Sequence, residues 1–404
     1  MNSNMHDPKV KIVALYFPQL HPIPENDRWW GPGFTDWVNV KKASPLYPGH
    51  RQPRVPLGAD HYDQSDPKVI RRQVALAKDH GISAFCHYHY WFDGKQLLQT
   101  PTNLLMSMKD LDIEFCLSWA NETWSRRWDG QDHHILQLQT HPPSKESWNR
   151  HFSYLIKAWT DRRALRIDDK PVFIIYRPEK VIDLGNMLDH WRTRAREYGI
   201  DDLYFMGVVQ YKAPQWETLR HLDALFLFQP FVSTFNLAER EPPPQPAWKQ
   251  ALAPVLRRVP RKLAVRAQDW IDRFKEPTTI DYDRIWQNII DFKIDRAVTT
   301  YEGAFVDWDN TARYGRRAKI YVGANPQRFE HWMSRLVEKV SHRPHSQRLI
   351  FINAWNEWAE GAYLEPCEEF QDGYLQAIKR VVEASGQVVQ RRPAEKSGLR
   401  SVRE

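Results

Sequence analysis

The chain has 404 residues, of which 42% are hydrophobic, and a formal net charge of +7 at pH 7. This length exceeds that of one small domain but suits a single α/β barrel with long loops. The basic residues accompany no nucleic-acid-binding motif, so we expect no nucleic-acid partner.

Cysteine usage and the first residues bear on the compartment. The three cysteines, Cys86, Cys116 and Cys367, are too few for a disulfide framework and favour a reducing compartment. Residues 1–8 lead into a predicted strand without the apolar region of a signal peptide. No apolar run approaches the roughly 18 residues that cross a bilayer. We therefore expect a cytoplasmic protein.

Eight apolar runs of strand length recur along the chain. They are apolar throughout rather than alternating, which is typical of strands covered on both faces. In chain order they are residues 12–17, 82–90, 115–119, 172–176, 204–209, 224–228, 297–301 and 349–353.

Amphipathic stretches lie between the strands, and Gly81 and Gly199 directly follow two of them as helix stops. The predicted helices are residues 67–80, 145–163, 181–198, 281–292 and 326–340. Strands separated by helices predict a parallel sheet. Eight repeats predict an α/β fold, a single (β/α)8 TIM-type barrel with long loops at the C-terminal face of the strands, where such barrels carry their active sites.

The basic residues suggest how the chain is divided. We expect one catalytic domain over residues 1–384, with a basic insertion at 239–276 between strands six and seven. Residues 385–404 are expected to form a basic, disordered tail. The insertion is either a solvated helical excursion or a patch that touches an anionic membrane peripherally.

Polar and aromatic residues gather where the predicted strands end. Carboxylates and amides bind sugar hydroxyls, and aromatic faces stack on the apolar faces of pyranose rings. We therefore predict a substrate-binding site for an oligo- or polysaccharide. Its residues are Tyr16, Trp29, Trp30, Asp36, Trp37, His87, Tyr88, His89, Tyr90, Trp119, Asn121, Glu122, Trp124, Tyr176, Gln210, Tyr301, Asp309, Asn310, Asn353, Trp355 and Asn356.

Glu357 and Glu360 follow the last strand and are the predicted catalytic residues. In a helical turn their Cβ atoms would lie roughly 5–6 Å apart. That agrees with the roughly 5–5.5 Å between the carboxyl groups of retaining glycosidases. Two close carboxylates also raise one another's proton affinity, so one can act as an acid near neutral pH. The alternative is a capping or salt-bridge pair.

At these residues the chain resembles the WbsX-like family, whose domain is similar to glycoside hydrolase family 99. The resemblance extends to about Ala384. Two positions depart from the family pattern, since Asp36 stands where Glu is expected and Cys367 follows Pro366 where Asp is usual. The matching stretches are YFPQLHP (16–22), NDRWWG (26–31), GFTDW (33–37), WANE (119–122), RRWDG (126–130), DNTAR (309–313) and NEWAEG (356–361).

The resemblance implies a barrel that acts on glycosides. Bacterial members are often linked to O-antigen and lipopolysaccharide assembly and named as glycosyltransferases. The hydrolases it resembles are retaining endo-α-mannosidases. Carried over, their roles make Glu357 a base at the sugar 2-hydroxyl and Glu360 the acid/base.

Three other clusters admit two interpretations each. Glu122 either orients a hydroxyl with Asn121 or balances Arg126 or Arg127. Asp307-Trp308-Asp309 matches a short metal–nucleotide-sugar signature, but nothing resembling a Gly-rich phosphate loop accompanies it. His87 and His89 point the same way on a strand, and hydroxyl contacts are favoured over zinc. We expect neither a metal nor a cofactor.

Three functions follow from these patterns. The first is an enzyme that breaks or rearranges a glycosidic bond of a bacterial surface polysaccharide through Glu357 and Glu360. The second is a cytoplasmic glycosyltransferase that uses a nucleotide sugar or a lipid-linked glycan. The third is a glycan-binding module without catalysis, against which the paired carboxylates argue.

Overall fold

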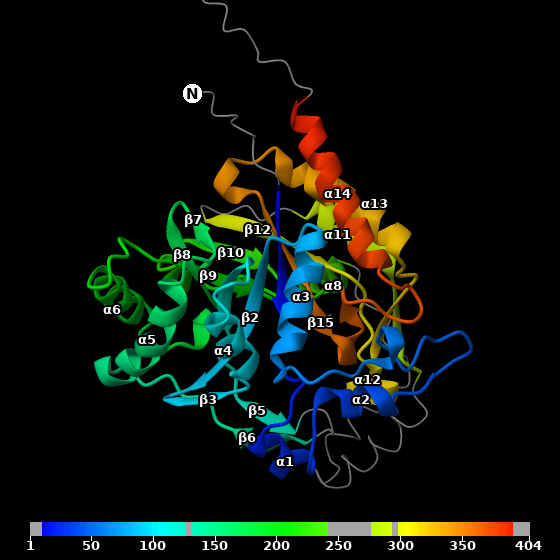
Figure 1. The fold of residues 1–404 in the computed structure, drawn as a ribbon, viewed down its shortest axis with the longest axis horizontal. Coiled ribbons are helices and arrows are strands. Elements are labelled where there is room, and N and C mark those ends of the chain that lie inside the picture. Colours follow the sequence, from blue (N-terminus) through cyan, green and yellow to red (C-terminus); the bar gives the residue numbers. More distant parts are fainter. Residues whose placement is uncertain (1–9, 127–130, 241–275, 293–297, 391–404) are drawn as a thin grey trace, which may run out of the picture.

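The computed structural model of the protein describes residues 10–126, 131–240, 276–292 and 298–390. Eight parallel strands form a closed barrel, because the first strand pairs with both the second and the last. Helices surround these strands (Figure 1). The predicted (β/α)8 fold is therefore confirmed. The barrel strands are β1 (Lys11–Tyr16), β2 (Ala84–Phe92), β4 (Glu114–Trp119), β8 (Lys170–Ile175), β9 (Tyr204–Val209), β10 (Ala224–Leu227), β12 (Thr299–Phe305) and β14 (Leu349–Asn353).

The strands are buried on both faces because alternate side chains enter two different cores. Along β1, Val13 and Leu15 belong to a core that fills the barrel interior. Ile12 and Ala14 belong to a second core that also contains residues of the surrounding helices. This double burial explains why the strand sequences are apolar throughout.

Five helices lie where amphipathic spacing predicted them. Four of them are capped by a side chain that accepts a backbone N–H from the first turn: Asp66, Ser144, Asp281 and Asn325. The last residues differ from the predicted ones because apolar spacing does not mark where a helix ends. These helices are α3 (Pro67–Asp79), α5 (Lys145–Trp159), α6 (Leu184–Arg196), α11 (Tyr282–Asp291) and α13 (Pro326–Ser341).

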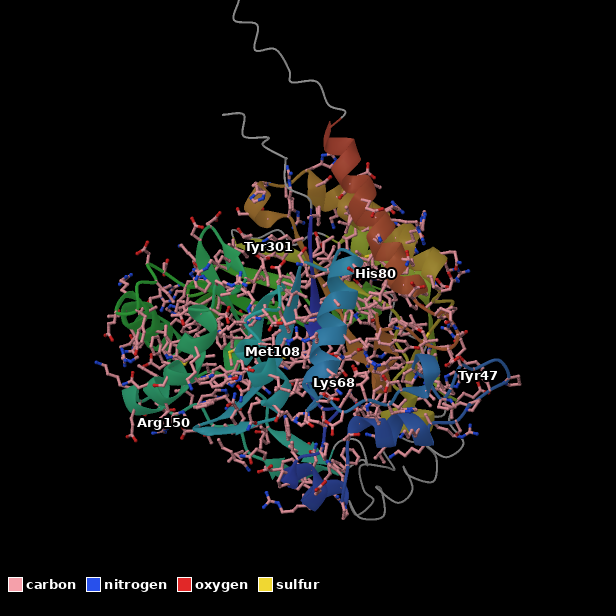
Figure 2. The ribbon with its side chains drawn as sticks, viewed as in Figure 1. Tyr47, Lys68, His80, Met108, Arg150 and Tyr301 are labelled. Atoms are coloured by element: carbon pink, nitrogen blue, oxygen red, sulfur yellow. The ribbon has the colours of Figure 1, made fainter. Side chains whose placement is uncertain are left out.

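The prediction for the seventh strand is wrong in position. β12 begins at Thr299 and continues through Gly303 to Phe305, so Tyr301 lies near its start instead of its exit. The Tyr301 hydroxyl donates to the Ser346 carbonyl at 3.0 Å, just before the start of β14. Figure 2 labels Tyr301 in the upper part of the view, away from α1 and α2. Tyr301-Glu302 has the composition of a strand exit, but apolar residues follow it and extend the strand.

The predicted C-terminal tail and the predicted basic insertion can be compared with the structure. Helix α14 (Gly373–Gln390) packs against α13 and extends past residue 384, where the sequence placed the start of the tail. Most of the basic insertion, residues 241–275, lies outside the described residues, and so do residues 391–404. Among the described helices, none combines the length and apolar character that a membrane span requires.

Long loops follow the barrel strands at their carboxyl ends, as predicted. Figure 1 shows α1, α2, α12, β5 and β6 together in the lower part of the molecule. In chain order these loops contain α1 (Pro24–Trp30), α2 (Asp36–Lys42), β3 (Lys95–Leu97), β5 (Trp124–Arg126), β6 (Gln131–Gln137), α12 (Thr311–Tyr314), β13 (Lys319–Val322), β15 (Asn356–Glu357), the 3-10 turn η6 (Trp358–Glu360) and β16 (Ala362–Tyr363). The remaining elements include α4 (Thr100–Ser107), β7 (Arg166–Ile167), α7 (Trp216–Leu219), α8 (Phe231–Arg240) and β11 (Thr278–Asp281).

Candidate active site

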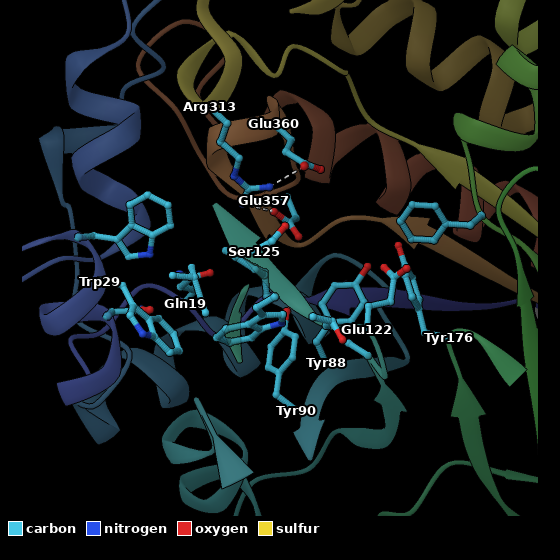
Figure 3. Close-up of a pocket in the computed structure, with 18 of the residues that line it drawn as sticks. Gln19, Trp29, Tyr88, Tyr90, Glu122, Ser125, Tyr176, Arg313, Glu357 and Glu360 are labelled. Carbon is cyan, nitrogen blue, oxygen red and sulfur yellow. Dashed lines mark hydrogen bonds and ion pairs between the residues drawn. The ribbon is translucent and has the colours of Figure 1, made fainter. Parts of the chain in front are cut away.

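A cavity of about 270 Å³ opens among the loops at the carboxyl ends of the strands. This volume is near the lower end of the roughly 300–1,000 Å³ of typical ligand pockets. Figure 3 shows its labelled lining: Arg313, Glu357 and Glu360 on one side, Trp29 and Gln19 on another, and Tyr88, Tyr90, Glu122 and Tyr176 facing them. Acidic and aromatic side chains therefore dominate the pocket.

The loop after β14 carries both predicted catalytic carboxylates. Glu357 ends β15, which pairs with β16, and Glu360 ends the turn η6. Gly361 follows with a φ of 67°, and a Cβ there would lie 3.0 Å from the Asp309 backbone nitrogen. That nitrogen donates to the Glu360 carbonyl at 2.7 Å. The turn is therefore tighter than the α-helical turn we expected, yet both carboxylates line the cavity.

Arg313 of α12 bridges the two carboxylates. Its Nη2 donates to Oε2 of Glu357 at 3.0 Å, and its Nη1 donates to Oε1 of Glu360. The same Nη2 donates to Oδ2 of Asp36 at 2.6 Å. The side chains are largely buried, with exposures of 6% for Arg313, 1% for Asp36, 8% for Glu357 and 19% for Glu360. One guanidinium thus holds three carboxylates together.

The environment favours the protonated form of both glutamates. Burial raises the pKa of Glu357 well above its usual range, the negative charges of Glu360 and Asp36 raise it further, and Arg313 lowers it. Burial likewise raises the pKa of Glu360, with Arg313 acting in the opposite direction and Asp36 in the same one. Desolvation disfavours a carboxylate charge, and so does a like charge nearby.

Glu365 anchors the same loop outside the pocket. Its carboxylate accepts hydrogen bonds from the Trp355 indole (3.1 Å), the Trp358 indole (2.8 Å), the Tyr62 hydroxyl (2.6 Å) and the Gln73 amide (2.7 Å). Glu365 is 6% exposed. Since the two indoles flank Glu357 in the sequence, their bonds to Glu365 fix the backbone that presents Glu357 to the cavity.

Aromatic side chains form the walls opposite the carboxylates. Trp124 packs edge-on against Trp29 and Tyr90, with ring centroids 5.9 and 4.9 Å apart. Tyr88 and Tyr176 pack edge-on at 6.2 Å. Burial raises the pKa of Tyr88, Tyr90 and Tyr176, so their hydroxyls stay protonated. The walls therefore combine flat apolar faces with hydroxyl groups that can donate hydrogen bonds.

Comparison with known sequences identifies the family. Residues 12–378 match the family described as Glycosyltransferase WbsX. The chain belongs to the WbsX family. Over 372 residues it is 35% identical to the protein WxcX of Xanthomonas campestris pv. campestris, in each of two strains. The match covers 92% of this chain but 49% of WxcX, so the chain spans about half the length of these relatives.

Two solved structures resemble this WbsX-family chain in fold. The GH99 endo-alpha-mannosidase of Bacteroides thetaiotaomicron matches with a TM-score of 0.50 and 13% identity, over 94% of this chain and 98% of the mannosidase. A protein described as glycoside hydrolase-like matches with a TM-score of 0.57 and 11% identity, over 95% and 96% of the two chains. The predicted resemblance to WbsX-like and family 99 proteins is therefore confirmed. At such identities the structural likeness concerns the barrel fold.

The pocket of this WbsX-family chain brings together part of the predicted site. Glu357 and Glu360 line it with seven of the expected substrate-binding residues. These seven are Trp29, Trp30, Tyr88, Tyr90, Glu122, Trp124 and Tyr176.

Strand alternation places other predicted residues outside the pocket. On β2, Tyr88 and Tyr90 belong to the inner core, whereas His87 and His89 point toward the surrounding helices. His87 Nδ1 lies 3.0 Å from the Thr102 hydroxyl, and His89 Nε2 lies 2.9 Å from His151 Nε2. For this reason neither histidine lines the pocket, where the sequence predicted substrate contacts for both.

Two further residues lie in the outer core for the same reason. The Tyr16 hydroxyl donates to Gln73 Oε1 at 2.7 Å, and the Trp119 indole donates to the Trp91 carbonyl at 3.1 Å. Both side chains therefore pack under helices and do not line the pocket.

Asn121 and Asn356 make the same contact on two sides of the barrel. Asn356 accepts from the Phe17 N–H (2.8 Å) and donates to the Phe17 carbonyl (2.9 Å). Asn121 accepts from the Arg177 N–H (2.8 Å) and donates to the Arg177 carbonyl (2.9 Å). Both are fully buried. They clamp neighbouring strand exits and leave no exposed amide for a sugar, contrary to our expectation.

The remaining predicted contacts of the last loop are also structural. Asn353 donates to the Gln229 carbonyl at 3.2 Å, and Trp355 is held by Glu365. Trp37 donates to the Tyr62 carbonyl at 2.8 Å. Each polar group is bonded within the protein, so these side chains position loops rather than line the cavity.

Asp309 and Asn310 likewise bond to the protein. Asp309 Oδ2 lies 2.8 Å from His50 Nε2 and accepts from Gln52 at 2.7 Å. Burial would raise the pKa of Asp309, but the bond with His50 and the charge of Arg54 bring it to about 2. Asn310 accepts from the Lys319 N–H at 2.8 Å.

Two of the clusters with two interpretations, those of Glu122 and Asp307, are ion-pair networks. Glu122 lies 3.2 Å from both Arg177 and Lys180, and Arg127, one of the two cations considered from the sequence, lies outside the described residues. Gln210 accepts from Arg177 at 3.3 Å next to this pair. Asp307 lies 3.1 Å from Arg51 and 2.9 Å from Arg54. Within the part of the chain that the structure describes, no group of three or more His, Cys, Asp or Glu side chains is arranged to hold a metal.

The polar pocket residues that sequence reasoning missed include Gln19, Asn26 and Arg313. Each of these three lies in a stretch that carries the family resemblance, so a signal was present. What the sequence lacked was a reason to prefer Arg313 over the many other arginines. That reason is its contact with Asp36, 277 positions earlier in the chain.

Proposed function

We propose that the chain is a retaining, glycoside hydrolase-like enzyme that breaks or rearranges a glycosidic bond of a bacterial surface polysaccharide. The observation that carries the proposal is the pair of buried glutamates bridged by Arg313 in a pocket walled by indoles and phenols. Family membership and the barrel fold support a carbohydrate-active enzyme.

The charge balance of the pocket suits proton transfer. Arg313 offsets one of the three carboxylate charges of Asp36, Glu357 and Glu360, and all four groups are largely buried. Three ionised carboxylates would leave two uncompensated negative charges in a desolvated site. We therefore infer that at least one glutamate keeps its proton near neutral pH, as a general acid must.

Each glutamate has a distinct role in this proposal. Glu360, the more exposed of the two, donates its proton to the glycosidic oxygen as the bond from that oxygen to the anomeric carbon breaks. It then takes a proton from the water or sugar hydroxyl that attacks the anomeric carbon. Glu357, deeper in the pocket, acts as a base at the sugar 2-hydroxyl, the role that the family resemblance implies. It takes the hydroxyl proton as the 2-oxygen bonds to the anomeric carbon and the glycosidic bond breaks. It returns the proton when the incoming water or sugar hydroxyl displaces the 2-oxygen.

The substrate is proposed to be an oligo- or polysaccharide. Flat aromatic faces beside carboxylates provide the stacking and hydroxyl contacts that pyranose rings need. A cytoplasmic location and contact with a membrane stay predictions from the sequence. The whole-protein activity of the longer relatives is also open, because this chain spans about half of WxcX.

A second candidate is a glycosyltransferase that uses a nucleotide sugar or a lipid-linked glycan. The family description, Glycosyltransferase WbsX, favours it. In that case the acceptor hydroxyl of another sugar replaces water in the same pocket. The two candidates differ in the donor that the pocket binds.

Ligand screening followed by product analysis tests the proposal. Thermal-shift measurements would compare nucleotide sugars with free mannose-type oligosaccharides. We expect stabilisation by an oligosaccharide, and NMR of its products should show retention of the anomeric configuration. Stabilisation by nucleotide sugars alone would favour the transferase, and binding without turnover of any ligand would indicate a glycan-binding module.

A further inference from the structure

We propose that Asp36 and Arg313 form a positioning pair that sets how many protons Glu357 and Glu360 hold between them. The inference rests on the proposed function, because it concerns the same two glutamates. Its basis is a single guanidinium bonded to carboxylates from three separate segments, α2, β15 and η6.

Asp36 holds Arg313 firmly in place. Its Oδ2 accepts from Arg313 Nη2 at 2.6 Å, and its Oδ1 accepts from Asn39 at 2.9 Å, so both oxygens are bonded within the protein. The Arg313 Cζ lies 5.2 Å from the centre of the Phe17 ring, which covers one face of the guanidinium. Arg313 is therefore fixed by a carboxylate at one edge and by a ring on one face.

The fixed guanidinium in turn locates both glutamates. Its Nη2 reaches Glu357 at 3.0 Å and its Nη1 reaches Glu360. Because both nitrogens belong to one rigid plane, the position of Arg313 determines how the two carboxylates lie relative to each other. Asp36 thus acts on the glutamates through Arg313 and through its own charge.

Other titratable groups around the pair leave this balance unchanged. Tyr88 and Tyr90 of β2 and Tyr176, which directly follows β8, face the glutamates, and their buried hydroxyls stay neutral. Glu122, beyond Tyr176, has its own cations in Arg177 and Lys180. Among the described residues, the charged groups bonded into this cluster besides the pair are therefore Asp36 and Arg313, one negative and one positive.

These two charges predict opposite responses to substitution. Asp36→Asn keeps an oxygen that can accept from Arg313 but removes a negative charge, so both glutamates should release protons more readily. Arg313→Met removes the positive charge, so both should hold protons more tightly. Removing a unit charge a few Å away should change proton affinity by about tenfold or more.

The experiment is a carboxyl titration of the resting protein. Glutamate labelled with ¹³C at the side-chain carboxyl gives one signal per residue, and Glu357→Gln and Glu360→Gln assign the two signals. The titration is compared in wild type, Asp36→Asn, Arg313→Met and Arg313→Lys. Asp161→Asn is the matched control, because Asp161 is a buried partner of Arg163 in a separate ion pair.

Opposite shifts of the two signals in Asp36→Asn and Arg313→Met would support the proposal, with Arg313→Lys close to wild type and Asp161→Asn unchanged. Wild-type titration in Asp36→Asn would overturn it, and this holds even if Arg313→Met does not fold. The readout needs no substrate. A protein that turns over no glycan can still show these shifts, and an active one can lack them, so the two proposals fail separately.

Discussion

Two kinds of carboxylate occur within nine residues of the same loop. Glu365 receives hydrogen bonds from four neutral donors and lies outside the pocket. Among the described residues, Glu357 and Glu360 share one cation, Arg313, and both line the cavity. All three are largely buried, and burial raises the pKa of each.

The difference between them is the set of partners. Four donors occupy the oxygens of Glu365, so this carboxylate is committed to holding Trp355, Trp358, Tyr62 and Gln73. The pair at Glu357 and Glu360 has fewer donors and faces a space that a ligand can enter. Burial by itself therefore does not distinguish a candidate catalytic carboxylate from a structural one, whereas the number of donors and contact with a cavity do.

The largest expected effect concerns turnover. Glu360→Gln should lower the rate by roughly 10²–10⁴-fold, because an amide cannot donate the proton that the leaving oxygen requires. Initial rates of product release from the glycan found by screening would measure this. Glu330→Gln, which alters a surface pair with Arg380, should keep the wild-type rate. A Glu360→Gln variant as fast as wild type would remove Glu360 from the mechanism.

The next effect concerns the free energy of unfolding. Here we expect Glu365 to matter more than Glu360, the reverse of the order expected for turnover. Glu365→Gln turns one of the accepting oxygens into an NH₂ group that faces other donors, so we expect a loss of about 2–3 kcal/mol in the free energy of unfolding. Denaturant unfolding followed by circular dichroism would measure it. Glu330→Gln should lose less than about 1 kcal/mol. If Glu365→Gln were as stable as wild type, the proposed anchoring of the loop would be rejected.

A smaller effect is the pH dependence of stability. The pKa of Glu357 is raised in the folded protein, so its contribution is fully present below the unfolded-state pKa near 4.5 and is lost as pH rises through the folded-state pKa. Glu357→Gln cannot ionise and should escape this loss. The variant should therefore gain stability relative to wild type between pH 5 and pH 8 in urea unfolding. A difference that stays constant over this range would contradict the raised pKa.

The fold could be predicted because burial in both cores makes the strand sequences apolar. Strands such as β9 are apolar on both faces, and the runs alternate with helices at regular intervals. The place of Glu357 and Glu360 in the pocket could be predicted because they lie in the loop that follows such a strand, β14. The partners of these residues could not, since the bond between Asp36 and Arg313 spans 277 positions of the sequence.

The roles of amides and aromatics were harder to predict for a second reason. An asparagine at a strand exit suits a sugar hydroxyl and a backbone clamp equally well, and Asn121 and Asn356 turned out to be clamps. For β2, composition suggested that four consecutive residues face the substrate. A strand turns successive side chains to opposite faces, so half of them lie under the helices.

The alternation of side chains between the two faces of β2 gives the smallest of the expected effects. Tyr88→Phe removes a hydroxyl from the pocket and should weaken glycan binding by about 1 kcal/mol, roughly fivefold in the dissociation constant. His87→Gln, one position earlier but on the outer face, should leave the affinity unchanged even if it lowers the melting temperature. Isothermal titration calorimetry with an oligosaccharide ligand would compare the two variants. Equal loss of affinity in both would mean that the glycan reaches the outer face of β2, which the burial of His87 against Thr102 opposes.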